Sequence, residues 1–331
     1  MIVYSKFNNN YRKKEYQLIT SIVKNGEVFY SLKATQDKAS NFFLNSFFDK
    51  YDYILANNFS IEVVRPEKVS DDKIKFKYQS GRTLGSLLFD EMQINNRDNF
   101  IFLIKEYVEF IKENVINSEL SSEFGDIFGN TDNNRKVECL KIGFVDLGFD
   151  NIITIDGKYI LIDYEWTFKF PVPYKYVIFR AITSFYASNS IYDPNKFFPL
   201  DKVYDLIGIS GKDEKEFISF EYNFRKHVSE GFDSDLTEFA DGYYGLKQEK
   251  NIDSGYFYQK NKEIELKNEE IELKNRQLNL KEREIESIKS SKFWKLRNLY
   301  IEFKNKIIFL IFHPISFAKK YTKKIFNHIK K

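Results

Sequence analysis

Hydrophobic and polar positions alternate along the first part of the chain, which is typical of β-strands. The alternating runs are IVYSKF (2–7), YQLITSIVK (16–24) and EVFYSLKA (27–34). Asn25-Gly26 separates the last two, and this pair suits a tight type I′ turn. The pattern therefore predicts a strand followed by a β-hairpin.

A change of period follows the hairpin. Phenylalanine, tyrosine and isoleucine recur near helical spacing over residues 37–56 and predict a helix. SIEVVRPE (60–67) and KIKFKYQ (73–79) return to a strand pattern. We therefore expect residues 1–82 to form a β-rich N-terminal lobe with the order β-β-β-α-β-β.

Helical periodicity dominates the next region, residues 83–250, which we expect to be a second, helical lobe. Helices are predicted over residues 83–92, 99–116, 174–188 and 214–230. Between them lies a polar stretch, 118–136, for which the pattern predicts irregular structure.

A second hairpin is predicted within this lobe. NIITI (151–155) and KYILIDYEW (158–166) flank Asp156-Gly157, which is a turn signal.

A seven-residue repeat covers residues 258–290. It predicts a long charged helix. Isoleucine and leucine form two narrow stripes on different faces, so self-association as a coiled coil and a solvated spacer both remain open.

Composition narrows the class of protein. The chain has 331 residues, 43% hydrophobic and 18% aromatic, enough for a packed core. One cysteine and three dispersed histidines exclude a disulfide framework and a zinc site built from these residues. The N-terminus has no apolar signal segment, so the expected compartment is the cytoplasm.

Charge is unevenly distributed. Residues 291–331 carry eleven Lys and Arg and one acidic residue, a net charge of +10, which leaves −7 for residues 1–290. The longest apolar run in this tail, IIFLIF (307–312), is far shorter than the roughly 20 residues that a span needs. A basic segment rich in aromatics predicts peripheral binding to an anionic membrane surface. The alternative is a packed helix pair with a lysine face, and no nucleic-acid partner is expected.

The candidate chemistry lies in FVDLGFDNIITIDGKYILIDYEW. Asp146 precedes Asn151 by five residues, and Asp163 lies twelve residues after Asn151, on the returning strand of the predicted hairpin. Phosphoryl transfer requires one carboxylate at the attacking hydroxyl and oxygen ligands for Mg²⁺ on the nucleotide phosphates. The spacing predicts Asp146 for the first role and Asn151 and Asp163 for the second. A turn or cap role remains the alternative for Asp146, and a strand start for Asn151.

Several motifs together resemble the protein-kinase-like fold in its aminoglycoside and choline kinase branch. The resemblance covers roughly residues 1–235 and is closest to the kinase domain of bacterial enzymes that terminate O-antigen chains, the methyltransferase–kinases. The motifs are YSKFNN (4–9), the Lys33 strand, SGRTL (80–84), DLGFDNI (146–152), IDYEW (162–166) and PVPYKYVIFRA (171–181).

The resemblance implies a two-lobed α+β fold that uses ATP and Mg²⁺. It assigns catalysis to Asp146, metal binding to Asn151 and Asp163, and nucleotide-phosphate binding to Lys33. Asn8 and Asn9 take the phosphate-loop position, and Tyr78 lies in the hinge beside the adenine.

The chain departs from that pattern in three places. Phe144 stands where the family usually has histidine, the first loop lacks the Gly-rich motif, and the helix over 37–56 contains no Glu to pair with Lys33. Glu165 is expected to be structural, paired with Arg180.

The implied function is phosphorylation of a hydroxyl on a sugar or lipid-linked glycan during surface-polysaccharide assembly, at the inner face of the cell membrane. The alternative from another class is a non-catalytic kinase-like scaffold that docks glycosyltransferases at the membrane.

Overall fold

The structure is a computed structural model that describes most of the first 248 residues. The described ranges are 1–7, 11–129, 136–155 and 157–248, with the single positions Lys274, Lys281, Tyr300, Ile301, Phe303 and Lys304. The chain divides into two compact units, residues 1–250 and 251–331. The predictions for the heptad helix and the basic tail therefore lie almost wholly outside the described residues. Within the described part, no helix combines the length and the apolar character that crossing a membrane requires.

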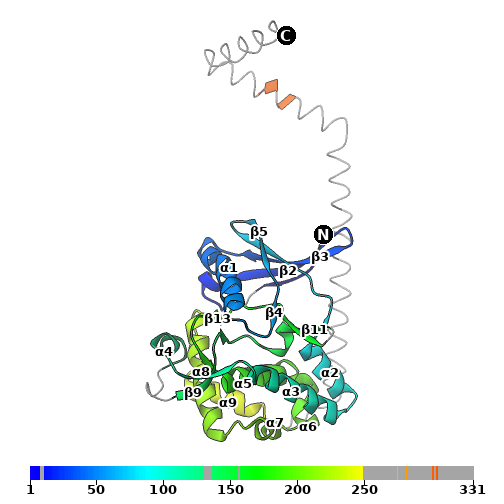
Figure 1. The fold of residues 1–331 in the computed structure, drawn as a ribbon. Coiled ribbons are helices and arrows are strands. Elements are labelled where there is room, and N and C mark those ends of the chain that lie inside the picture. The colour runs from blue at the N-terminus through cyan, green and yellow to red at the C-terminus, as the bar shows by residue number, and fades with distance from the viewer. Residues whose placement is uncertain are drawn as a thin grey trace. The chain divides into compact units, whose positions relative to one another are not determined.

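A five-stranded antiparallel sheet forms the N-terminal part of the first unit, in the order β1-β2-β3-β6-β5 (Figure 1). Its strands are β1 Ile2–Phe7, β2 Leu18–Asn25, β3 Val28–Thr35, β5 Pro66–Ser70 and β6 Lys73–Lys77. Leu18 and Ile74 are fully buried and anchor the inner face. The strands expected near 2–7, 16–24, 27–34 and 73–79 are thus confirmed.

The turn between β2 and β3 differs in type from the expected one. Asn25 still belongs to β2 and pairs with Val28, so the two-residue loop is Gly26-Glu27. Gly26 has φ +63°, and neither neighbour lies in the left-handed region. A positive φ at the first loop position alone is the pattern of a type II′ turn, which requires glycine there.

Helix α1, Asn41–Ala56, packs against this sheet and confirms the predicted helix. It begins later than residue 37, because Asp37 instead caps a short 3-10 turn, accepting a hydrogen bond from the Ala39 N–H at 2.8 Å. Phe43, Leu44, Phe47 and Ile54 form its buried stripe.

The strand predicted over 60–67 divides between two sheets, so that prediction is wrong. β4, Glu62–Val63, pairs in parallel with β12, Lys158–Leu161, whereas β5 begins at Pro66. Proline has no N–H to donate and is confined to edge strands or strand starts. Here it stands at the first position of an edge strand, and the chain changes sheets before it.

Helices and short sheets make up the rest of the first unit. The helices are α2 Leu84–Gln93, α3 Arg97–Lys112, α4 Ser122–Phe128, α5 Tyr174–Ser188, α6 Pro194–Phe197, α7 Leu200–Ile207, α8 Gly211–Val228 and α9 Leu236–Gly245. The helices predicted near 83–92, 174–188 and 214–230 are confirmed, and the α+β class with them. The helix predicted over 99–116 is confirmed only as far as Lys112, because residues 115 and 116 belong to a strand, β8. Helix α8 starts three residues earlier than expected, because Ser210 and Asp213 form a capping box.

The stretch 118–136 is not irregular as predicted. It contains the end of β8, Val115–Glu119, and α4, while residues 130–135 lie outside the described residues. Phe124 and Phe128 are fully buried and pack against Phe220 and Phe224 of α8, with ring centroids 5.2 and 5.5 Å apart. These two aromatics, one helical turn apart, form the apolar face of α4. The polar residues around them hide this face in the sequence pattern.

The remaining strands are short. β7 Arg82–Thr83 and β11 Ile152–Ile155 complete the four-stranded sheet, in the order β4-β12-β11-β7. β9 Lys136–Leu140 pairs with β8 on one side and with β14 Val172–Pro173 on the other. β10 Gly143–Phe144 pairs with β13 Thr167–Phe168.

Candidate active site

Two strand pairings bring the candidate residues to one place. The hairpin of β11 and β12 pairs Ile152 with Leu161, and its open end is closed by the Ile162 N–H, which donates to the Asn151 carbonyl at 2.9 Å. Asp163 is the next residue. The predicted hairpin is therefore confirmed, although its second strand ends at Leu161 and not at residue 166. Gly157 has φ +75°, and Asp156 lies outside the described residues.

The second pairing places Asp146 beside the same segment. β10 and β13 are antiparallel, and the Val145 N–H extends the ladder by donating to the Trp166 carbonyl at 3.1 Å. Asp146 thus emerges next to the chain that carries Asp163 and Glu165. Phe144, at the position where the related family has histidine, is buried with its ring 4.8 Å from Phe59, so it acts as a packing residue.

Asp146 is a carboxyl group in an environment that favours proton uptake. Burial, together with Glu165 and Asp163, raises its pKa to about 6, although Arg180 acts in the opposite direction. The Arg180 guanidinium lies 3.3 Å from Asp146 Oδ1 and forms a second ion pair with buried Glu221. Asp146 keeps 22% of its side chain exposed, so a molecule in solution can reach it.

Asn151 is fixed by its own loop. Its side-chain amide donates to the main-chain oxygen of Asp146 at 3.0 Å. Only the NH₂ group can make this bond, so the side-chain oxygen is the atom left for another ligand.

Lys33 lies in β3 and reaches Asp163 across 130 residues of sequence. Its Nζ is 2.9 Å from Asp163 Oδ2 and 3.3 Å from the Thr20 hydroxyl. The side chain is only 3% exposed. Burial alone lowers the pKa of Lys33, but Asp163 and Glu165 outweigh it and hold the pKa above its usual value. Lys33 is therefore a fixed positive charge at the site.

Glu165 is not paired with Arg180, so that expectation is wrong. Its Oε1 forms an ion pair with Arg12 at 2.8 Å, and its Oε2 lies 3.7 Å from Lys33 Nζ. Arg180 instead pairs with Asp146 and Glu221. Burial raises the pKa of Glu165, but Lys33 and Arg12 outweigh it and hold the pKa below its usual value.

Arg12 and Lys50 belong to the site and were missed at the level of sequence. Lys50, in α1, donates from Nζ to the main-chain oxygen of Glu165. Burial lowers the pKa of Lys50 to about 8. Arg12 follows the first loop and forms an isolated β-bridge with Ser229, where the Glu230 N–H donates to the Tyr11 carbonyl at 2.6 Å. No spacing in the sequence signals these contacts.

The remaining predicted nucleotide contacts are less defined. Asn8 and Asn9 lie outside the described residues. Tyr78 follows β6, is 43% exposed, and has its ring centroid 5.8 Å from that of Phe29. Its contact with the adenine stays a prediction.

The donor set fits a magnesium ion. Asn151 presents a carbonyl oxygen, and Asp163 presents a carboxylate that is 27% exposed. Mg²⁺ prefers such hard oxygen ligands, keeps several waters, and needs only one or two protein groups beside the phosphates of a substrate. Within the described residues no cluster of three or more His, Cys, Asp and Glu suits a metal. A site that shares its metal with a phosphate needs no such cluster.

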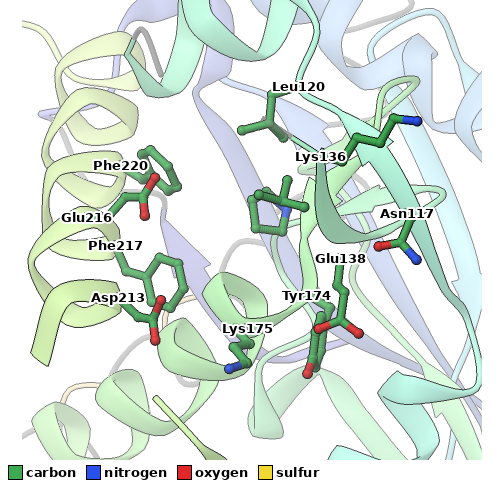
Figure 2. A pocket seen from close by; sticks show the side chains of 12 residues that line it. Asn117, Leu120, Lys136, Glu138, Tyr174, Lys175, Asp213, Glu216, Phe217 and Phe220 are labelled. Carbon is green, nitrogen blue, oxygen red and sulfur yellow. The ribbon is translucent and has the colours of Figure 1, made fainter. Parts of the chain in front are cut away.

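A well-formed cavity of about 250 Å³ lies elsewhere, among β8, β9, α5 and α8. Figure 2 shows Phe217 and Phe220 of α8 across the cavity from Leu120 and Lys136. Its lining does not include Asp146, Asn151, Asp163, Lys33 or Glu165, the group that we call the Asp146 constellation. We place the chemistry at the constellation, because only there do fixed charges and oxygen ligands converge.

The constellation thus combines a buried cation, two oxygen ligands and a carboxylate of raised pKa, the groups that polyphosphate chemistry requires. No protein-family model and no curated protein sequence matches the chain.

Similar solved structures include the streptomycin–ATP–APH(2")-IIa ternary complex, with 11% identity and a TM-score of 0.41 over 73% of this chain and 89% of that one. They also include Plasmodium vivax ethanolamine kinase, with 13% identity and a TM-score of 0.36 over 74% and 81%. WaaP in complex with acyl carrier protein has 9% identity and a TM-score of 0.32 over 69% and 80%.

Proposed function

We propose that residues 1–250 form a kinase-like phosphotransferase that uses Mg²⁺ and ATP. One observation carries the proposal. The buried Lys33 of the sheet forms an ion pair with Asp163, and strand pairing sets Asp163 close to Asp146 and Asn151. Buried charges are costly unless they are paired, and such arrangements cluster at functional sites.

Each residue has a distinct role in the proposed reaction. Lys33 neutralises nucleotide phosphate oxygens, and Asn151 and Asp163 hold the metal, which when bound offsets the charge on the phosphates. Asp146 accepts the proton of the acceptor hydroxyl as that oxygen bonds to the γ-phosphorus. The bond from the γ-phosphorus to the bridging oxygen breaks, and ADP leaves. With a pKa of about 6, Asp146 is ionised at neutral pH and still close to the pH at which a general base is most effective.

The acceptor class follows from the sequence resemblance: a hydroxyl of a sugar or lipid-linked glycan in O-antigen-type polysaccharide assembly, at the inner face of the membrane. A cavity of about 470 Å³ lies beside the Arg12–Ser229 bridge, and its lining supports the proposal of a hydroxylated acceptor. Aromatic Tyr11 and Phe232 line it together with acidic Glu230 and Asp233. Side chains of these two kinds stack on and hydrogen-bond to polyhydroxylated molecules.

Phosphate transfer is the direct test of the function. Wild-type protein is mixed with Mg²⁺, ATP and a panel of sugars and lipid-linked glycans, and ADP release is measured. We expect turnover with at least one acceptor, and a loss of about 10²-fold or more in Asp146→Asn, the range of a positioned acid–base group. Turnover that Asp146→Asn leaves unchanged contradicts the role of Asp146. No turnover with any acceptor favours the scaffold alternative.

A further inference from the structure

The helix that packs on the sheet lacks the acidic partner that a phosphate-binding lysine normally needs. In protein kinases a helix-borne Glu pairs with the strand lysine and must be in place for activity. Here the two acidic residues of α1, Asp49 and Asp52, are both exposed. The residue that α1 directs to the site is the cation Lys50, which donates to the main-chain oxygen of Glu165.

Glu165 supplies a buried carboxylate next to Lys33 from a different part of the fold. Its side chain is 5% exposed, and its Oε2 lies 3.7 Å from Lys33 Nζ. Among the described residues no hydrogen-bond partner is found for Oε2, whereas Oε1 is held by Arg12 at 2.8 Å. One oxygen therefore forms an ion pair with Arg12, and the other lies near the lysine.

Asp163 is the other acid that contacts Lys33, and it differs from Glu165 in exposure. The Asp163 side chain is 27% exposed, and it is the residue assigned above to the metal. Because Asp163 is shared between Lys33 and the metal, Asp163 alone cannot fix the position of Lys33 both with and without the metal. Glu165 is enclosed by Lys33, Arg12 and Lys50, and it reaches solvent far less.

We infer that Glu165 is the positioning carboxylate for Lys33, replacing the helix-borne Glu that the chain lacks. The inference rests on the proposed function, because it gives Lys33 a nucleotide-phosphate role. Glu165 touches neither nucleotide nor acceptor in this role. It orients the lysine, and Arg12 and the Lys50 contact hold Glu165 in turn.

Binding of Mg·ATP by calorimetry tests the inference on the full chain. We expect Glu165→Gln to weaken Mg·ATP binding about tenfold or more, because the neutral amide no longer forms ion pairs with Lys33 and Arg12. Binding of adenosine, which has no phosphates, should be unchanged. A purely structural role for Glu165 would lower both affinities together.

A charge relocation provides the rescue. In the double variant Glu165→Gln with Lys50→Glu, the carboxylate moves onto α1, and we expect Mg·ATP affinity to return to within about threefold of wild type. Glu214→Gln is the matched control. Glu214 is also buried and forms an ion pair with a lysine, Lys247, at 2.7 Å, and this pair lies elsewhere in the fold. It should leave Mg·ATP affinity unchanged.

The outcomes separate the two claims. Wild-type affinity in Glu165→Gln overturns the inference, whereas an absence of Mg·ATP binding by wild-type protein overturns the proposed function itself. If Glu165→Gln does not fold, Glu165→Asp decides. It keeps the charge but shortens the side chain, so weakened Mg·ATP binding supports the inference and wild-type binding overturns it.

Discussion

At the scale of single residues, the site is a set of charges whose partners come from distant segments. Arg180 bridges Asp146 and the buried Glu221, and it lies over the ring of Phe224 at 4.9 Å. The Glu221 carboxylate also accepts a hydrogen bond from Tyr176 at 3.0 Å. The Glu221 carboxylate therefore helps to hold the Arg180 guanidinium in the position from which it contacts Asp146.

The pH dependence of stability should report on Glu221. Burial raises the pKa of Glu221, but Arg180 and Arg225 outweigh it and hold the pKa below its usual value. A carboxyl with a depressed pKa in the folded state stabilises the protein above its unfolded pKa, about 4.3, and loses that contribution as pH falls through the folded value. We expect Glu221→Gln to lower the free energy of unfolding by about 3–5 kcal/mol at pH 7, as for a broken buried ion pair.

Denaturant unfolding of both proteins between pH 3 and pH 7 measures this effect. The difference between wild type and Glu221→Gln should shrink as the pH falls below about 4.3. A difference that stays constant across this range would mean that the carboxylate charge does not stabilise the fold.

The sequence locates only part of this residue-level picture. Asp146, Asn151 and Asp163 were predictable as a group, because a turn signal and two apolar runs show that the chain folds back between them. Arg12 and Lys50 were not, because their contacts with Glu165 join segments that lie more than 100 residues apart in the sequence. The pairing of Glu165 with Arg180 was wrong for the same reason, because the partners of Glu165 are Arg12 and Lys33, which come from the distant N-terminal part of the chain.

At the scale of elements, periodicity predicts long helices and hairpins well and short elements poorly. α5 coincides with its predicted range, and β2 and β3 pair as expected. α4 was missed because its apolar face consists of two phenylalanines in a polar context. The strand over 60–67 was overextended because β propensity alone does not show a change of sheet before Pro66.

The α4–α8 contact should be a main source of stability despite its short length. Phe128 is fully buried and stacks on Phe224 with an interplanar angle of 14°. We expect Phe128→Ala to lower the free energy of unfolding by about 3–5 kcal/mol, the usual cost of removing a buried phenylalanine. Denaturant unfolding measures this, with Phe102→Ala on the exposed side of α3 as the control. A change below about 1 kcal/mol would show that α4 is not part of the folded core.

At the scale of the whole molecule, the body and the tail carry opposite net charge. Residues 1–290 carry −7, and residues 291–331 carry +10. The tail's partner is a proposal from sequence, since its residues lie almost wholly outside those described.

Vesicle co-sedimentation tests the tail. Each basic residue near an anionic leaflet contributes about 1 kcal/mol, so full-length protein should pellet with anionic vesicles. A protein truncated to residues 1–290 should not. Salt should weaken the binding without abolishing it, because burial of the aromatic side chains is not screened. Equal pelleting of the two proteins excludes the tail as the anchor.

The central claim is that Asn151 and Asp163 hold a metal-bound nucleotide beside Lys33. Calorimetric binding of ATP with and without Mg²⁺, on wild type and on Asp163→Ala, measures it most directly. Asp205→Ala, which changes an exposed aspartate of α7, is the matched control. We predict Mg²⁺-dependent ATP binding by wild type and by Asp205→Ala, and its loss in an Asp163→Ala protein that remains folded by circular dichroism. The same affinity for Mg·ATP in Asp163→Ala and wild type would contradict the account.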